Sequence, residues 1–114
     1  MDENSLVEWL YTECPEHLKS KKFRHGLNKI KILGALISHS NSKGCTKQSI
    51  GEYTGIPVKN LGRYLSDLTR EGLIISTHPY NKNTRYRITD DGKEIFKLTV
   101  EIAKEIKGVW EIEG

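Results

Sequence analysis

Side chains that can bind nucleic acid lie close together in residues 54–72 of this sequence, TGIPVKNLGRYLSDLTREG. Lysine neutralises a phosphate, asparagine can form two hydrogen bonds with an adenine, and arginine can form two with a guanine. Lys59, Asn60 and Arg63 supply these three groups, and Tyr64 follows them directly. The chemistry that they offer is non-covalent readout of base edges or phosphates, so we expect all four side chains to contact DNA.

Gly55, Pro57 and Gly72 indicate that a helix positions these side chains. Gly55 suits a turn that needs a positive φ, and Pro57 suits the first position of a helix, where its missing N–H is no loss. Gly72 follows the last residue of the pattern, where helices commonly end. The sequence therefore predicts a turn and then a helix over residues 57–71.

This predicted helix has an apolar face and a cationic face. The apolar face repeats at i, i+4 and i+7 through Leu61, Leu65 and Leu68. At about 100° per residue, the opposite face carries Lys59, Arg63, Ser66 and Arg70. Such a helix suits the major groove of DNA, which admits an α-helix. An ordinary amphipathic helix with a basic solvent face is the alternative that this stretch leaves open.

Charge is distributed unevenly along the chain, whose formal net charge is +3. Residues 1–16 contain five acids and no Lys or Arg, and residues 88–114 contain seven acids and four Lys. Residues 17–87 contain 14 Lys and Arg but only three acids. A basic centre between acidic ends is typical of a surface that binds a polyanion, so we expect double-stranded DNA as its partner.

Length and cysteine usage narrow the class of protein further. At 114 residues the chain has the length of one domain, and it has no apolar run of the length that crosses a membrane. The acidic N-terminus lacks the pattern of a secretory signal, and two cysteines without a CxxC motif suit a reducing compartment. We therefore expect a cytoplasmic protein.

A metal site is the main alternative chemistry. Cys14 and His17 have ligand-like spacing, and Cys45 or His39 could join them. Pro15 makes that geometry awkward, and no second close pair of ligands is present. The sequence also lacks a phosphate-binding glycine loop and a nucleophile motif. We therefore expect no metal, no cofactor and no catalytic residue.

Residues 1–25 are predicted to form an acidic helix and a basic connector. In the helix, within residues 1–16, Ser5 and Glu8 fit a capping box and Pro15 marks the end. The connector, residues 17–25, is basic and has no clear period.

Residues 26–89 are predicted to form the main domain. It begins with a buried helix over 26–38, and Thr46 caps a short helix over 47–53 that turns Tyr53 inward. With the cationic helix, this short helix forms a helix-turn-helix. A β-branched, apolar stretch and then an alternating stretch predict a hairpin, with strands over residues 73–77 and 84–89 and a polar, basic tip between them.

Residues 90–114 are predicted to form a long helix that mediates dimerisation. Thr89 caps this helix, and its apolar stripe extends past anything that a domain of this size needs to cover. We therefore expect a homodimer. The interface is expected to contain Ile95, Leu98, Ile102, Ile106, Val109 and Trp110, together with Leu6, Trp9 and Leu10 of the first helix.

From Ile30 to Phe96 the chain resembles a winged helix-turn-helix domain of bacterial and archaeal transcription regulators. TGIPVKNLGRYLSDLTREGLI resembles the turn, recognition helix and first wing strand, and YRITDDGKEIF resembles the motif that leads out of the second wing strand. The chain is similar to MarR-, ArsR- and PadR-like regulators. It is also similar to small archaeal winged-helix proteins that dimerise through a C-terminal coiled coil.

The resemblance implies a mainly α fold with a small β-hairpin, and it extends the set of DNA contacts. Thr46, Lys47 and Gln48 would meet phosphate at a helix N-terminus. Asn81, Lys82 and Arg85, in the wing over residues 78–85, would contact the DNA backbone or minor groove.

Two other functions remain open beside a homodimeric, sequence-specific transcriptional regulator. Winged helices also serve as protein-interaction modules, and chromatin-type proteins coat DNA without sequence preference.

Overall fold

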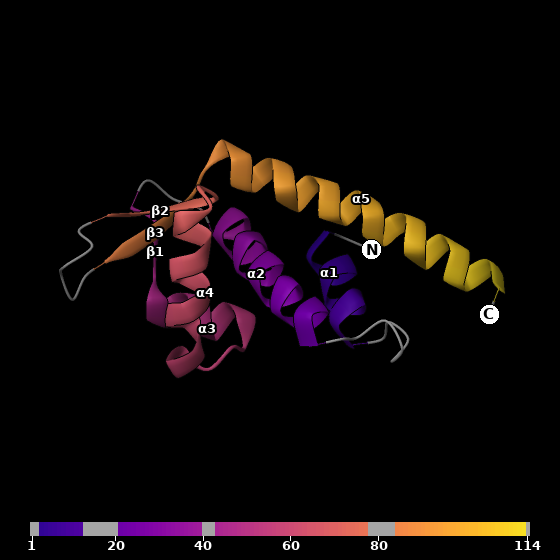
Figure 1. The fold of residues 1–114 in the computed structure, drawn as a ribbon, viewed down its shortest axis with the longest axis horizontal. Helices are drawn as coiled ribbons and strands as arrows, with labels where there is room; N and C mark the ends of the chain where they lie inside the picture. The colour runs from indigo at the N-terminus through magenta and orange to yellow at the C-terminus, as the bar shows by residue number, and fades with distance from the viewer. Residues whose placement is uncertain (1–2, 13–20, 40–42, 78–83, 114) are drawn as a thin grey trace.

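The computed structural model describes residues 3–12, 21–39, 43–77 and 84–113. The elements are helices α1 (Glu3–Thr12) and α2 (Lys21–Ser38), strand β1 (Cys45–Thr46), helices α3 (Lys47–Thr54) and α4 (Val58–Arg70), strands β2 (Ile74–Thr77) and β3 (Arg85–Ile88), and helix α5 (Asp90–Glu113). The molecule is elongated, with the strands near one end and α5 running to the other (Figure 1). Among the described residues, no helix has both the length and the apolar character needed to cross a membrane.

The three strands form one small antiparallel sheet in the order β1-β3-β2. β2 and β3 pair from Ile74 opposite Ile88 to Thr77 opposite Arg85, which confirms the predicted hairpin. β1 adds a third strand on the other edge of β3, with Cys45 opposite Tyr86. The sequence did not predict β1, because two residues are too few to show a period.

The hydrophobic core draws on every helix. Its buried helical residues are Leu6, Val7 and Trp9 of α1; Leu27, Ile32, Leu33 and Leu36 of α2; Ile50 of α3; Leu61, Tyr64, Leu65 and Leu68 of α4; and Phe96, Val100 and Ala103 of α5. The buried helix predicted over residues 26–38 and the predicted apolar face of α4 are therefore confirmed.

Leu6 and Trp9 occupy a different place from the one expected. They are 3% and 5% exposed, and the ammonium of Lys107 on α5 lies 4.9 Å from the centre of the Trp9 ring. Because α5 folds back over α1, one chain already buries both side chains, and the structure places them in the core and not on a free surface. The side chains of Leu10, Val109 and Trp110 lie outside the described part.

Two predicted helix starts are corrected. α1 begins at Glu3, so Ser5 lies inside the helix and is not its cap. α2 begins at Lys21 and passes through Gly26, so the last residues of the predicted connector are helical. The rest of that connector, with Cys14, Pro15 and His17, lies outside the described residues.

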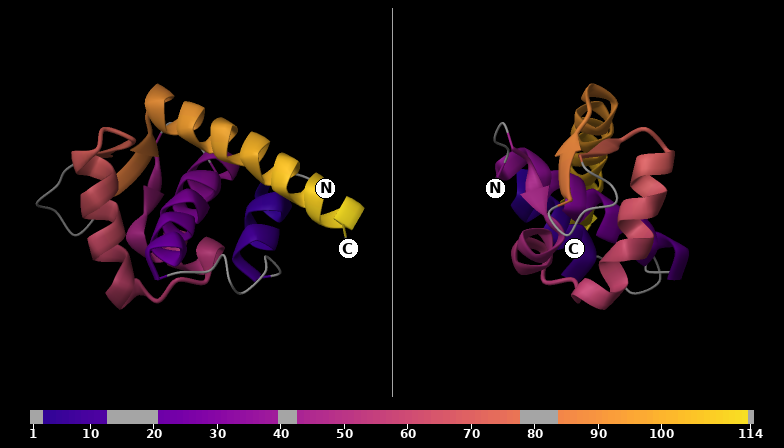
Figure 2. Two further views of the ribbon diagram at one scale, coloured as in Figure 1. Left: turned by 45° about the vertical axis from the view of Figure 1, so that its right-hand side comes forward. Right: turned by 90° about the vertical axis from the view of Figure 1, so that its left-hand side faces the viewer.

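A tight turn joins α3 to α4, as predicted. Gly55 has φ 74°, its N–H donates to the Gly51 carbonyl at 2.9 Å, and Ile56 is buried beside it. At Gly51 a Cβ would lie 3.1 Å from a methyl carbon of Val58, so this glycine lets the two helices approach closely. The turn directs α4 along the outside of the molecule beside the sheet (Figure 2).

Thr89 and Gly92 join the segment between β3 and α5 to the residues that follow α4. The Thr89 N–H donates to the Leu73 carbonyl at 3.1 Å, and the Thr89 hydroxyl donates to the Gly72 carbonyl at 2.7 Å. The same hydroxyl accepts the Gly92 N–H at 3.1 Å, which confirms Thr89 as the cap of α5. A Cβ at Gly92 would overlap the Leu73 carbonyl oxygen, so this joint has room only for glycine.

Candidate nucleic-acid interface

The outer face of α4 presents the predicted cations to solvent. Leu61, Leu65 and Leu68 are 0%, 2% and 1% exposed, which turns the opposite face outward. The four side chains predicted for that face are all exposed: Lys59, Arg63, Ser66 and Arg70. Within the described part of the chain, Lys59 and Arg63 have no ion-pair partner. Both cations are therefore available to an external anion.

Asn60 and Tyr64 have different positions on α4. Asn60 is exposed at the edge of the cationic face, next to Lys59. Tyr64 is only 8% exposed, and its hydroxyl accepts a hydrogen bond of 3.0 Å from the side-chain amide of Asn28 on α2. The expected position of Tyr64 at DNA is therefore corrected: it belongs to the core. On the helical projection Tyr64 lies at the edge of the leucine face, about 40° from Leu68, and this position was the signal for burial.

A cluster of charged residues anchors the second half of α4 to α2. The Lys29 ammonium lies 2.7 Å from a carboxylate oxygen of Glu71 and 3.6 Å from one of Asp67. Asp67 also pairs with Arg70 at 2.7 Å. Arg70 is thus tied to its own helix, and Lys29 is a positioning residue that the sequence did not reveal, since it is 42 residues away from Glu71.

The N-terminus of α3 lies beside the N-terminal half of α4. The Thr46 hydroxyl accepts the Ser49 N–H at 3.2 Å, which confirms Thr46 as the cap of α3. Gln48 is exposed, and Lys47 is half-buried. A Cβ at Gly62 would lie 3.2 Å from the Lys47 ammonium nitrogen. Gly62 therefore makes room for a cation from α3 next to Arg63.

The wing contributes cations from β3. The Arg85 guanidinium donates to the Gly44 carbonyl at 3.1 Å, so this half-buried side chain also ties the sheet to the segment before β1. Arg87 is exposed and was not among the predicted contacts, although the alternation of the strand placed it beside Arg85. The wing tip, with Asn81 and Lys82, lies outside the described residues.

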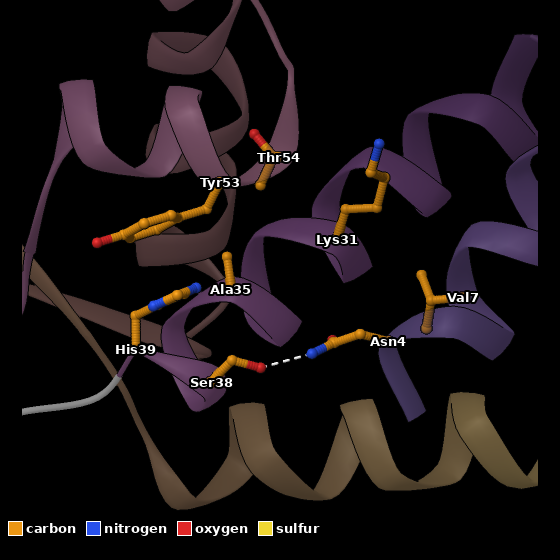
Figure 3. A pocket seen from close by; sticks show the side chains of 8 residues that line it. All are labelled: Asn4, Val7, Lys31, Ala35, Ser38, His39, Tyr53 and Thr54. Carbon is orange, nitrogen blue, oxygen red and sulfur yellow. Dashed lines mark hydrogen bonds between the residues drawn. The ribbon is translucent and has the colours of Figure 1, made fainter. Parts of the chain in front are cut away.

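A pocket of about 190 Å³ lies where α1, α2 and α3 meet (Figure 3). Asn4 donates to the Ser38 hydroxyl on one side, and the rings of His39 and Tyr53 stack at 3.6 Å on the other. Tyr53 is 48% exposed, so the prediction that it points inward is wrong. Its ring packs on His39 at the end of α2.

Of the four candidate metal ligands that the sequence offers, Cys45 and His39 lie among the described residues. Among the described residues, no group of three or more His, Cys, Asp or Glu side chains is placed to hold a metal ion. Cys45 is buried, and its thiol donates to the His39 carbonyl at 3.5 Å. Burial raises the pKa of the Cys45 thiol, and the positive charge of Arg85 offsets only part of that rise. Cys45 is therefore a packed, protonated thiol at neutral pH.

In the Cys14→Ser variant, Cys45 is the only thiol, and we expect iodoacetamide to alkylate it at least about tenfold more slowly than a cysteine in a short peptide. The thiolate is the reacting form, and burial disfavours it. Mass spectrometry over time at mildly alkaline pH measures the rate, and urea should restore the peptide rate. Alkylation at the peptide rate without urea would contradict this assignment.

Comparison with known proteins gives one match. A family model described as winged helix-turn-helix matches residues 28–107, which cover α2 from Asn28, all of α3 and α4, all three strands, and α5 as far as Lys107. No curated protein and no solved structure matches the chain.

Proposed function

Because this chain belongs to the winged helix-turn-helix family, a fold that indicates DNA binding, we propose that it binds double-stranded DNA at specific sequences and regulates transcription. The recognition element is α4, inserted in the major groove. Lys59, Asn60 and Arg63 read base edges or phosphates there, and the wing contacts the neighbouring backbone.

The geometry of α4 is the observation that supports this proposal most directly. Its leucines are held in the core, while Lys59 and Arg63 are exposed and have no ion-pair partner among the residues that the structure describes. Lys47 of α3 adds a third cation beside Gly62. A rigid helix with one cationic face meets two needs of groove binding, because it brings donors to base edges and neutralises phosphates on either side.

Contacts from α2, and from Thr89 just before α5, fix the orientation of this helix in advance. Asn28 bonds to Tyr64, and Lys29 pairs with Glu71. Beyond α4, Thr89 bonds to Gly72 and Leu73. Since these contacts hold α4 at its middle and at its C-terminal end, little conformational entropy is lost at the interface on binding.

We propose a homodimer as the functional form. Ile95, Leu98 and Ile102 of α5 are 39%, 45% and 55% exposed, and one chain leaves them uncovered. Two copies related by a two-fold axis would place two α4 helices in major grooves about 34 Å apart, on a site with palindromic symmetry. Occupation of such a site within a promoter would block or recruit polymerase, with the protein acting in the cytoplasm.

Titration of labelled DNA by fluorescence anisotropy at several salt concentrations tests the proposal. We expect the logarithm of the association constant to fall linearly with the logarithm of salt concentration, because phosphate contacts release counterions. Lys59→Ala should reduce the slope by about 1. Lys104→Ala is the control, since Lys104 is an exposed lysine on α5, remote from α4.

Selection from a random DNA library distinguishes the remaining functions. Enrichment of one motif supports a sequence-specific regulator, whereas equal binding to every duplex indicates a chromatin-type protein. Absence of binding at low salt would exclude both and favour a protein-interaction module.

A further inference from the structure

Val58, the first residue of α4, leaves an apolar side chain in solvent on the recognition helix. It is 46% exposed, and of the large apolar side chains exposed in the described part of the chain it is the one that belongs to α4. Helix stability does not explain it, because valine is a weaker helix former than alanine, and an acid at this end would suit the helix dipole better. Exposure alone assigns no contact, since single apolar side chains on a surface are common. The position of Val58 on the helix is more informative.

Contact with α3 holds Val58 in place. A Cβ at Gly51 of α3 would lie 3.1 Å from the Cγ2 methyl of Val58, so this methyl occupies the space beside the glycine. A valine in a helix also populates mainly one χ1 rotamer. Little side-chain entropy is therefore left to lose when another surface packs against the exposed part of Val58.

Val58 lies among the groups proposed to contact DNA. Lys59 and Asn60 follow it directly and are exposed. At about 100° per residue, Gly62 lies about 40° from Val58 and one turn further along α4, and the Lys47 ammonium is next to Gly62. The N-terminal residues of a recognition helix are the ones that contact base edges in the major groove. Val58 is thus the apolar member of a set of side chains that can reach base edges and phosphates.

The major groove of unmodified DNA offers an aliphatic side chain a single apolar group. Its base edges present hydrogen-bond acceptors and donors, which valine cannot pair, and the C5 methyl of thymine, which valine can contact. Cytosine presents an amino donor and no methyl, and the two purines present no methyl either. A phosphate gains no hydrogen bond from valine. A base that Val58 contacts favourably must therefore be a thymine.

We propose that Val58 reads a thymine, by packing its exposed methyl surface against the C5 methyl of that base, beside the bases that Asn60 and Arg63 contact. This inference rests on the DNA binding proposed above and adds an apolar contact to the polar ones. The preferred DNA site then has one position at which thymine is favoured through its methyl group and not through a hydrogen bond.

Deoxyuridine tests this contact, because it differs from thymidine only in lacking the C5 methyl. In the site obtained by selection, one thymine at a time is replaced by deoxyuridine, and fluorescence anisotropy measures the affinity. At one position we expect the wild-type chain to lose about fourfold in affinity, which corresponds to the burial of one methyl group. Val58→Ala should bind the thymine and deoxyuridine forms of that position equally.

The combination of the two changes separates a base contact from a packing effect. If Val58→Ala only loosens the packing of α4 on α3, it weakens binding to both forms of the site by the same factor, and the proposal is wrong. Ile75→Ala is the matched control, since Ile75 is an aliphatic side chain of β2 that is 49% exposed. Its loss should leave the deoxyuridine effect at about fourfold. Far-ultraviolet circular dichroism checks that each variant is folded.

The wild-type chain alone also decides the question. If no deoxyuridine substitution lowers its affinity, or if selection enriches no site with an A·T pair, Val58 reads no thymine. The DNA-binding proposal survives that result, because the affinity for unmodified DNA measures it separately. Absence of binding to unmodified DNA at low salt overturns both proposals.

Discussion

Arg63→Ala should weaken binding to the preferred DNA site by roughly 5- to 150-fold, which corresponds to about 1–3 kcal/mol, the range for one bidentate contact to a base. Arg63 is exposed on the face of α4 opposite Leu61 and Leu65, and no acid within the described residues pairs with it. Its guanidinium is therefore free to form two hydrogen bonds to a guanine. Anisotropy titration against the selected site and a scrambled site measures the loss, which should be larger on the selected site.

Arg70→Ala is the matched control on the same helix face. Arg70 is as cationic as Arg63 and its side chain is 74% exposed, but Asp67 holds its guanidinium at 2.7 Å. Because Asp67 already neutralises its charge, we expect Arg70→Ala to change the affinity for DNA by less than about threefold. Equal losses from Arg63→Ala and Arg70→Ala would mean that α4 binds through its overall charge and not through base readout.

Gly92→Ala should lower the free energy of unfolding by about 3 kcal/mol, the upper end of the range for overpacking in a core. A Cβ at position 92 would overlap the Leu73 carbonyl oxygen, which is backbone and accepts the Thr89 N–H. Relief of the overlap must separate the start of α5 from the residues that follow α4. Urea unfolding, followed by circular dichroism, measures the change.

Gly62→Ala provides the comparison for Gly92→Ala, since both replace a glycine within a helix. Among the described residues, the one close neighbour of a Cβ at Gly62 is the ammonium nitrogen of Lys47, at 3.2 Å, and the end of a lysine side chain can move. Alanine also favours a helix over glycine by about 1 kcal/mol. Gly62→Ala should therefore stabilise the protein. Destabilisation of similar size in both variants would show that the backbone joint at Gly92 is not the cause.

Much of the recognition unit could be predicted from local patterns. The period of Leu61, Leu65 and Leu68 requires one buried face, and this same period determines that Lys59 and Arg63 face solvent. Gly55, Thr46 and Thr89 identify turns and caps because their conformations and hydrogen bonds involve residues only a few positions away. Such features depend on nearby residues, so they are readable in a single sequence.

Other features depend on which distant segments meet, and only the tertiary structure decides them. Tyr64 is core because α2 lies against it and the Asn28 amide donates to its hydroxyl, and Trp9 is core because α5 folds back over α1. Gly92 must be glycine because Leu73, 19 positions earlier, lies against it.

The sequence by itself thus determined the cationic helix, the turn before it, and which of its faces is buried and which faces solvent, since helical period and capping are local. The tertiary structure decided which of the apolar side chains are buried within one chain and which stay exposed. Leu6 and Trp9 are buried within the chain, whereas Ile95, Leu98 and Ile102 remain exposed. The physical reason is that burial belongs to a pair of surfaces, and the sequence of one helix does not specify the surface that it meets.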